Sequence, residues 1–318
     1  MAKRVLSQMD FDGRYKGLLI PYELTEQEKS AIKTQFNCLT YHLGIKRRIG
    51  SISESGKVYE SSIGGIPVVI KTNDVLDEFT NEVAINDLLN DYPDYVLQLI
   101  TSEICQITNE YGETGKLGIM VLEKAAGDLR QVLDTSELAD RQLDEMMEKM
   151  FKCLDLLARM SISHGDFHCG NLFFTNRDGR NTWVIGDFGK SRDYYKEISN
   201  RFVFPSVDRE FHRFLTTLLE HISKSKIQSQ RYNLINGNQI TRHNNFIARL
   251  IYLRNFYGRA VNKMENRFDE YIEKGYDKGK DRIHAIRESE LYFIKIMQNA
   301  WIESGQLDLK HLENDYTR

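Results

Sequence analysis

The segment HGDFHCGN, residues 164–171, is followed after a short interval by DFG, residues 187–189, and these two stretches decide the interpretation of the chain. Between them, residues 172–185 contain two apolar runs around an Asn-Arg-Asp-Gly turn. Apolar runs joined by Asp-Gly are typical of a β-hairpin, which returns the chain to its starting point. We therefore expect the polar side chains of both segments to converge, namely Asp166, Asn171 and Asp187.

These three side chains are of the kind that phosphoryl transfer requires. A carboxylate near the acceptor hydroxyl positions the nucleophile, and oxygen ligands hold Mg²⁺ on the nucleotide phosphates. Asp166 would supply that carboxylate, and Asn171 and Asp187 would hold the metal. Either motif alone is a weak signal, because a loop aspartate is more often a turn former or a helix cap. Their order and spacing around a hairpin favour a common site.

Local patterns divide the chain into a strand-rich N-terminal half and a helical C-terminal half. Thr25 and Glu28 form a T-x-x-E capping box, which predicts one helix near the start. Strand signals follow between residues 46 and 124, interrupted by a helical pattern over 74–90. Later, apolar residues recur at spacings of three and four over 143–157, which is one buried helix face.

In this order and spacing the two stretches resemble the protein-kinase-like superfamily, in which H-x-D-x-x-x-x-N precedes D-F-G. The resemblance covers about residues 46–225. It implies an α+β fold with two lobes: a small β-rich lobe over 46–124 and a larger helical lobe with its core over 125–225. Residues 1–45 would form an extension with one helix, and 226–318 a helical continuation of the second lobe. ATP would bind between the lobes with Mg²⁺, or with Mn²⁺ as an alternative ion.

The resemblance also implies a lysine on the third strand that pairs with the α- and β-phosphates. The run VVIK, residues 68–71, supplies Lys71 after a Gly-Gly-Ile-Pro turn, with Val69 beside the nucleotide. A helix glutamate should orient that lysine. Glu82 is the best candidate, although it follows the lysine at an unusually short interval, and Glu78 is the lesser one.

The loop that would cover the phosphates departs from the family pattern. G-x-G-x-x-G-x-V falls on Ser51, Ser53, Gly56 and Val58, so serine replaces the first two glycines. Serine is small enough for backbone amides to approach a phosphate, though less freely than glycine. Without the other motifs, the segment would be interpreted as an ordinary serine-rich hairpin.

The segment LEKAAGDL after the expected strands resembles the family's hinge, which holds the adenine. By that resemblance, Glu123 and Ala125 would offer main-chain hydrogen bonds, and Asp128 would reach the ribose. Leu122 would form the back of the adenine pocket and Phe173 part of its floor. The same segment would also serve as a flexible connector.

Three departures bear on the acceptor rather than on ATP. Gly165 stands where many regulated kinases have an arginine that pairs with a phosphorylated loop, His168 replaces the usual lysine, and residues 190–207 contain no A-P-E. The resemblance implies a divergent serine/threonine-type protein kinase, of a viral or effector kind, acting on a protein hydroxyl. H-G-D-x-H-x-x-N is similar to the loop of aminoglycoside and choline kinases, so a small-molecule kinase is one alternative. A partner-binding pseudokinase is another.

Composition and cysteine usage limit the remaining classes. The 318 residues carry 43 basic and 46 acidic side chains, a formal charge of −3, which argues against a nucleic-acid partner. No secretory signal follows Met1 and no apolar run approaches the ~20 residues of a membrane span, so we expect no membrane insertion. No CxxC spacing occurs, and we expect reduced thiols and a cytoplasmic location, or the host cytoplasm or virion if viral. The cysteines concerned are Cys38, Cys105, Cys153 and Cys169.

Overall fold

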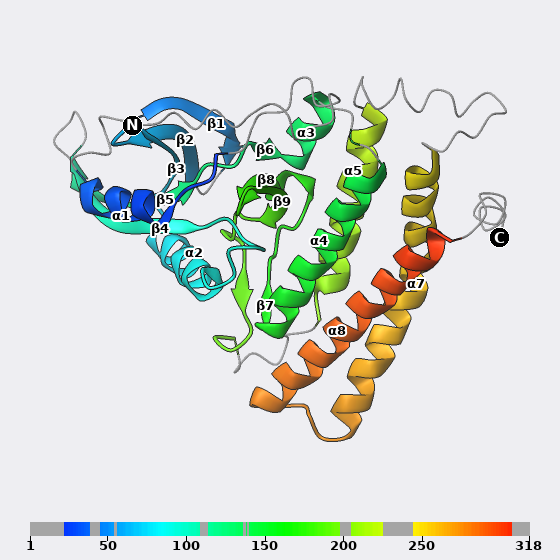
Figure 1. Ribbon diagram of the computed structural model, residues 1–318. Helices are drawn as coiled ribbons and strands as arrows, with labels where there is room; N and C mark the ends of the chain where they lie inside the picture. The colour runs from blue at the N-terminus through cyan, green and yellow to red at the C-terminus, as the bar shows by residue number, and fades with distance from the viewer. Residues whose placement is uncertain are drawn as a thin grey trace.

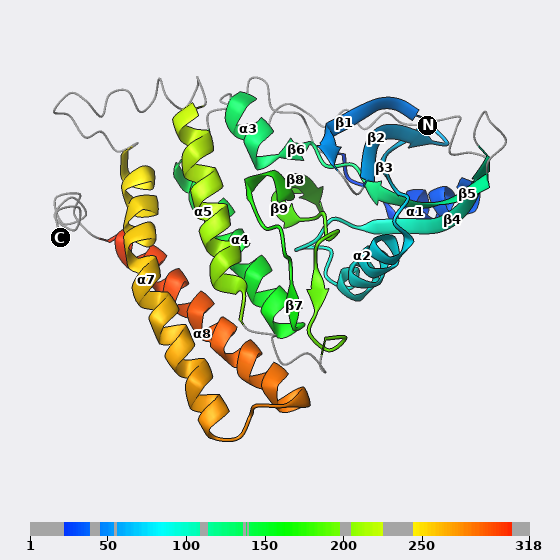
Figure 2. The ribbon, with the colours of Figure 1, turned by 180° about the vertical axis from the view of Figure 1, so that it is seen from behind.

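The structure is a computed structural model that describes residues 22–38, 45–53, 56–108, 114–135, 138, 140–197, 205–224 and 244–306. It is a mixed α+β structure, as the sequence predicts, with antiparallel sheets and several helices. The largest sheet, with α1 and α2, lies at one end of the molecule, and the other helices lie at the opposite end (Figures 1 and 2). The expectations for residues 1–21, 39–44, 226–243 and 307–318 fall outside the described residues.

The sheet at the N-terminal end is antiparallel and five-stranded, in the order β1-β2-β3-β5-β4. Gly64 and Gly65 turn the chain between β2 and β3 with φ of 58° and 82°, values that glycine adopts at little cost. The strands are β1 (Ile45–Ser53), β2 (Gly56–Ile63), β3 (Ile66–Asn73), β4 (Leu99–Thr108) and β5 (Thr114–Glu123).

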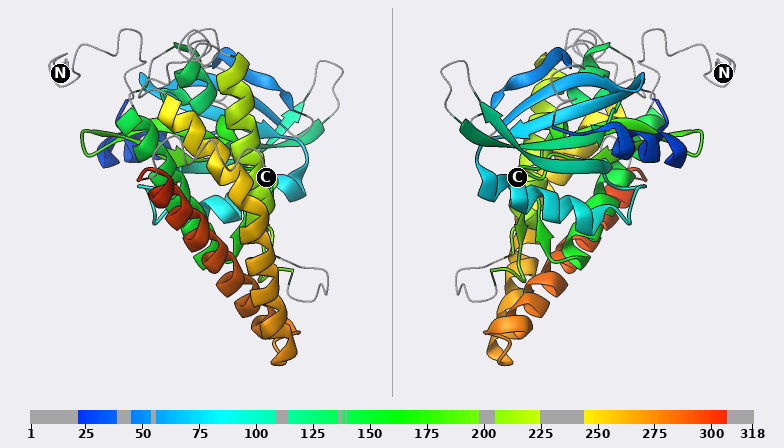
Figure 3. Two further views of the ribbon diagram at one scale, coloured as in Figure 1. Left: turned by 90° about the vertical axis from the view of Figure 1, so that its right-hand side faces the viewer. Right: turned by 90° about the vertical axis from the view of Figure 1, so that its left-hand side faces the viewer.

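Helices make up most of the rest of the described chain. The last two form a long antiparallel hairpin that projects away from the sheet (Figures 1 and 3). Every helix in the described ranges falls short, in length or in apolar character, of what a membrane span requires. The bounds are α1 (Glu26–Gln35), α2 (Leu76–Leu89), α3 (Leu129–Thr135), α4 (Asp140–Arg159), α5 (Val207–Lys224), α7 (Asn244–Glu273) and α8 (Gly279–Ser304).

Strand alternation gives the five-stranded sheet two different faces. Val68 and Ile70 of β3 point to one face and pack with Ile32 of α1, which begins at the predicted capping box. Lys71 points to the other face, where Phe79 of α2 packs on the sheet. The lysine therefore faces α2 and the C-terminal part of the molecule.

A second sheet, in the order β6-β8-β9, joins the large sheet to the helices. Its strands are β6 (Gly127–Asp128), β8 (Leu172–Arg177) and β9 (Arg180–Ile185). The pairing of β8 with β9 confirms the predicted hairpin, whose turn contains the expected Asp-Gly pair. A short pair, β7 (Ile162–Ser163) with β10 (Arg192–Asp193), lies nearby.

The main core lies among the helices. The apolar face predicted for residues 143–157 is buried in α4 and packs with α5 and α8. Phe211 of α5 stacks on Phe151 of α4 and meets Phe293 of α8 edge to face. This core fixes α5, which supports the candidate site.

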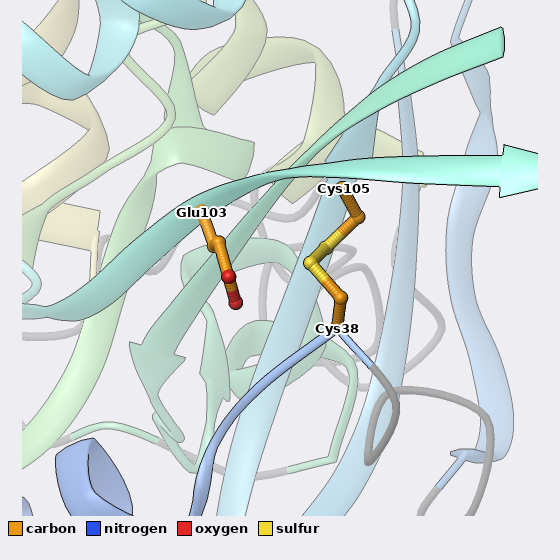
Figure 4. A group of neighbouring side chains, drawn as sticks. All are labelled: Cys38, Glu103 and Cys105. Atoms are coloured by element: carbon orange, nitrogen blue, oxygen red, sulfur yellow. A yellow bond between two sulfur atoms is a disulfide. The ribbon is translucent and has the colours of Figure 1, made fainter.

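The expectation of reduced thiols is wrong for two of the cysteines. Cys38 and Cys105 form a disulfide that ties the segment after α1 to β4, with the Glu103 carboxylate within 4.8 Å of both sulfurs (Figure 4). Cys153 and Cys169 are free and buried. Because 67 residues separate the bonded pair, no local spacing pattern signals it, and only the packing of α1 on the sheet brings the two residues together. Cysteine usage therefore no longer argues for a reducing compartment.

Candidate functional site

Lys71 lies at the centre of the site, on the sheet face that α2 covers. Its Nζ donates to Glu82 Oε1 at 2.6 Å and to Asp187 Oδ1 at 2.6 Å. The short interval between Lys71 and Glu82 suffices because β3 ends at Asn73 and α2 begins at Leu76. The structure thus brings Lys71, Glu82 and Asp187 together, and it is Glu82 rather than Glu78 that pairs with the lysine.

Burial and mutual attraction set the charges of this cluster. Burial alone would lower the pKa of Lys71, but Glu82 and Asp187 outweigh burial and hold that pKa above its usual range. Burial opposes ionisation of Asp187, yet Lys71 prevails and lowers the pKa of that carboxyl. For Glu82 burial prevails, and its pKa is raised. Lys71 is therefore a cation and Asp187 an anion at neutral pH.

The end of β9 is anchored to the chain just before β4, which places Asp187 beside the large sheet. Leu97 N–H donates to Ile185 O at 2.8 Å, and Ile185 N–H donates to Tyr95 O at 2.8 Å. Gly186 packs so closely that a Cβ there would lie 2.7 Å from the Leu97 side chain. These contacts bring the segment that begins with Asp187 to Lys71.

The β8–β9 hairpin then brings Asn171 to the same place. Leu172 pairs with Ile185, and Gly186 N–H donates to Asn171 O at 3.2 Å. The Asn171 side chain donates from Nδ2 to Asp166 O at 2.9 Å, and no described residue donates to its Oδ1. Its amide oxygen is therefore free to accept a ligand.

The side chains of Asn171 and Asp187 both offer oxygen atoms, the kind of ligand that Mg²⁺ prefers. Asp187 has φ of +65°, a left-handed conformation that is rare without glycine and occurs preferentially at functional sites. Its carboxylate has lone pairs beyond those that Lys71 and Gly189 N–H use. Mg²⁺ usually takes one or two protein oxygens and fills the rest of its octahedron with phosphate and water.

Asp166, the expected catalytic carboxylate, lies between two cations that no sequence motif singles out. Lys190 Nζ is 3.0 Å from Oδ2, and Arg213 Nη1 of α5 is 2.5 Å from Oδ1. His168 Nε2 is further away, 3.9 Å from Oδ1. Both oxygens of Asp166 are thus held by positive charge.

Gly165 is required by the path of the loop. Its φ is +77°, and a Cβ there would lie 2.1 Å from Lys190 O. Any side chain would be strained by the backbone and would collide with the neighbouring segment. Packing therefore explains why arginine is absent from this position.

Buried polar groups hold the loop in place. Glu210 Oε1 of α5 accepts hydrogen bonds from Gly165 N–H at 2.9 Å and from Ser163 Oγ at 2.6 Å. His164 is fully buried, and burial lowers its pKa to about 4, so the ring is neutral at pH 7. Its Nε2 lies 3.2 Å from Gly186 O, which ties the loop to the start of the Asp187 segment.

His168 has a structural role in the same loop. Its Nδ1 accepts from Gly170 N–H at 3.0 Å, which caps the short helical turn Cys169–Asn171. The histidine that stands in place of the usual lysine therefore packs within its own loop.

Some of the residues expected around the nucleotide lie on the same face of the sheet as Lys71. Val58 pairs with Lys71 across β2 and β3, and Leu122 pairs with Val69 across β3 and β5, so all four face the same way. Phe173 pairs with Asp128 across β6 and β8. For the expected phosphate loop, the side chains of residues 45–56 lie outside what the structure describes; the positions concerned are Ser51 and Ser53 on β1 and Gly56 at the start of β2.

Glu123 and Ala125 differ in their availability to a ligand. The Glu123 carboxylate binds the Arg177 guanidinium with both oxygens, and its N–H donates to Gln98 O at 3.1 Å. The backbone N–H of Glu123 is therefore already hydrogen-bonded within the protein. Ala125 is half-buried, and its backbone groups bond to no other described residue.

Asp128 caps α3. Its Oδ1 accepts from Gln131 N–H at 3.0 Å, its own N–H donates to Gln131 Oε1 at 3.2 Å, and Arg130 pairs with Oδ2 at 3.0 Å. This reciprocal arrangement is a capping box, and the spacing D-x-x-Q in the sequence is the signal that identifies it. Both carboxylate oxygens are therefore engaged within the protein.

No protein-family model matches the sequence, and no curated protein matches it either. The geometry of the site therefore has to carry the functional conclusion.

Proposed function

We propose that the protein is a phosphotransferase that uses Mg·ATP, and that it acts as a divergent serine/threonine protein kinase on a protein hydroxyl. One observation carries the proposal. The Lys71 ion cluster, the free amide oxygen of Asn171 and the carboxylate of Asp166 are brought together by the β8–β9 hairpin and its anchor at Ile185. A cation, metal ligands and a carboxylate in one place are the parts that phosphoryl transfer needs.

The proposed roles follow from the contacts. Lys71 binds the α- and β-phosphates, and Glu82 holds the lysine where it can reach them. Asp187 and Asn171 hold Mg²⁺, which neutralises phosphate charge when it is bound. Asp166 orients the acceptor hydroxyl and takes its proton late in the transfer. Positioning and charge stabilisation supply most of the rate in this chemistry.

The proposal does not require activation by phosphorylation of the loop after Asp187. The arginine that would read such a phosphate has no room at Gly165, and Lys190 already contacts Asp166. The site in this structure is assembled without a modified residue. We therefore propose that the enzyme is active as translated.

The two alternatives are less favoured for physical reasons. Aminoglycosides and choline are cations, and the pair Lys190 and Arg213 beside Asp166 would repel them. A pseudokinase usually lacks one of the charged groups, whereas Lys71, Asp166 and Asp187 are all present here.

Transfer from [γ-³²P]ATP tests the proposal. The purified protein is incubated with Mg·[γ-³²P]ATP alone, with a generic protein, and with an aminoglycoside or choline. We expect label on protein, in the first or second incubation. Label on the small molecule alone would favour the first alternative, and absence of label together with no thermal shift on adding Mg·ATP would refute the proposal.

A further inference from the structure

Positive side chains surround the loop that carries Asp166. Lys190 and Arg213 both pair with this single carboxylate, and they remain 65% and 48% exposed while Asp166 is only 17% exposed. Arg130 lies against the same loop, so close to Gly170 that a Cβ there would lie 2.4 Å from its guanidinium. A molecule that approaches Asp166 therefore meets Lys190 and Arg213 first.

The charged side chains around the Asp166 loop have an excess of positive charge. Arg130 is balanced by Asp128, at 3.0 Å, whereas Asp166 alone faces both Lys190 and Arg213. His168 adds no charge at neutral pH, because burial lowers its pKa and its Nδ1 accepts a hydrogen bond from the backbone. One positive charge is left over beside the carboxylate that would receive the acceptor.

The same two cations flank the oxygens that an acceptor hydroxyl would use. Lys190 donates to Asp166 Oδ2 at 3.0 Å, and Arg213 lies 2.5 Å from Oδ1, which has no hydrogen-bond partner among the described residues and keeps lone pairs for a hydroxyl. An acceptor with its own carboxylates would pair with Lys190 and Arg213 and neutralise the charge left over beside Asp166. A neutral acceptor would gain no such pairing, and a cationic one would be repelled.

We propose that the acceptor is an acidic protein segment, in which Asp or Glu side chains flank the accepting serine or threonine and pair with Lys190 and Arg213. This inference rests on the proposed function. In the transfer, the hydroxyl oxygen forms a bond to the γ-phosphorus and the bond from that phosphorus to the β–γ bridging oxygen breaks. ADP leaves, and the hydroxyl proton passes to Asp166 and then to solvent.

Matched peptides test the acceptor class. Each has one serine in the same sequence, flanked by Glu, by Gln or by Lys, and kcat/KM is measured with Mg·[γ-³²P]ATP. We expect the Glu peptide to exceed the Gln peptide at least about tenfold, the ratio that a difference of about 1.4 kcal/mol produces. The Lys peptide should be the poorest. Equal values for the three peptides would overturn the proposal.

Charge reversal identifies the responsible side chains. In Lys190→Glu and Arg213→Glu the preference for the Glu peptide should be lost, and the Lys peptide should gain. Lys190→Gln and Arg213→Gln give milder versions in case a reversed charge disturbs folding. Arg180→Glu is the control, since this exposed arginine changes the net charge equally but lies at the other end of the β8–β9 hairpin from Asn171.

Two outcomes separate this inference from the proposed function. If the four variants raise KM for ATP and leave the peptide preference unchanged, the cations hold the nucleotide and the acceptor proposal fails. The wild type could instead transfer label to itself or to a generic protein and yet show no preference for the Glu peptide. In that case the acceptor proposal fails while the proposed function stands. Absence of any Mg·ATP-dependent label, together with no thermal shift on adding Mg·ATP, refutes both.

Discussion

Removing the Cys38–Cys105 disulfide should destabilise the protein by several kcal/mol. The bond closes a span of 67 residues that contains β1, β2, β3 and α2. In the chain-entropy model, cross-linking a loop of this length restricts the unfolded chain by about 4 kcal/mol. Cys38→Ser removes this restriction, and the effect on the folded state is small because Cys38 is only partly buried.

Urea unfolding measures the loss. With a denaturant slope near 3 kcal/mol/M, about 4 kcal/mol lowers the unfolding midpoint by roughly 1 M. Wild-type protein unfolded in reductant is the matched control, and its midpoint should equal that of Cys38→Ser. Thiol titration in denaturant should find two free thiols before reduction and four after it, since Cys153 and Cys169 are unpaired.

Two results would refute this reasoning. Four reactive thiols in unreduced protein would mean that the bond is absent. Two thiols with an unchanged midpoint in Cys38→Ser would mean that the bond exists but does not restrain the unfolded chain. Cys105→Ser should be the more damaging of the pair, because Cys105 is buried and its replacement places a hydroxyl in an apolar cluster.

The remaining predictions concern the site and its support. Gly165→Ala should lower the rate of phosphate transfer more than tenfold while Mg·ATP still binds, because the methyl group would lie 2.1 Å from Lys190 O. Transfer kinetics and calorimetry measure the two effects, and transfer at the wild-type rate would contradict the prediction. Lys71→Met should weaken ATP binding at least about tenfold, measured by calorimetry, since it removes the cation that we propose binds the phosphates; unchanged affinity would exclude that role. Burial raises the pKa of Glu290 to about 8 from an ordinary 4.5, so the neutral form stabilises the fold fully below pH 4.5, and that stability is lost as the pH rises through 8. Glu290→Gln keeps the acceptor oxygen for Ser206 N–H and cannot ionise, so its melting temperature should fall less than that of the wild type between pH 5 and pH 9. An equal fall of the melting temperature in both proteins would contradict the raised pKa of Glu290.

Part of the candidate site could be predicted because the signals are local. The Asp-Gly turn and its flanking apolar runs predict the hairpin, and the hairpin places Asn171 beside the segment that begins at Gly186. The contact of Lys71 with Glu82 follows from a strand that leads almost directly into a helix.

The other contacts depend on residues that are distant in sequence. Arg213 and Glu210 reach the loop from α5, and nothing near them in the chain indicates that they face Asp166 and Gly165. The Cys38–Cys105 bond likewise depends on the packing of α1 against β4. Asp128 is a different case, because the local spacing D-x-x-Q already indicates the cap that the structure shows, whereas the family resemblance implies a contact with ribose.

The rate of phosphate transfer in two matched variants tests the central claim most directly. Asp166→Asn removes the proposed acceptor carboxylate, and Asp178→Asn makes the same chemical change at the exposed turn of the β8–β9 hairpin. With Mg·[γ-³²P]ATP and a protein acceptor, we predict that Asp166→Asn transfers label about 10²- to 10⁴-fold more slowly than the wild type, while it still binds Mg·ATP. Asp178→Asn should transfer at the wild-type rate. Equal rates in the two variants would contradict the assignment of this site as a phosphotransfer centre.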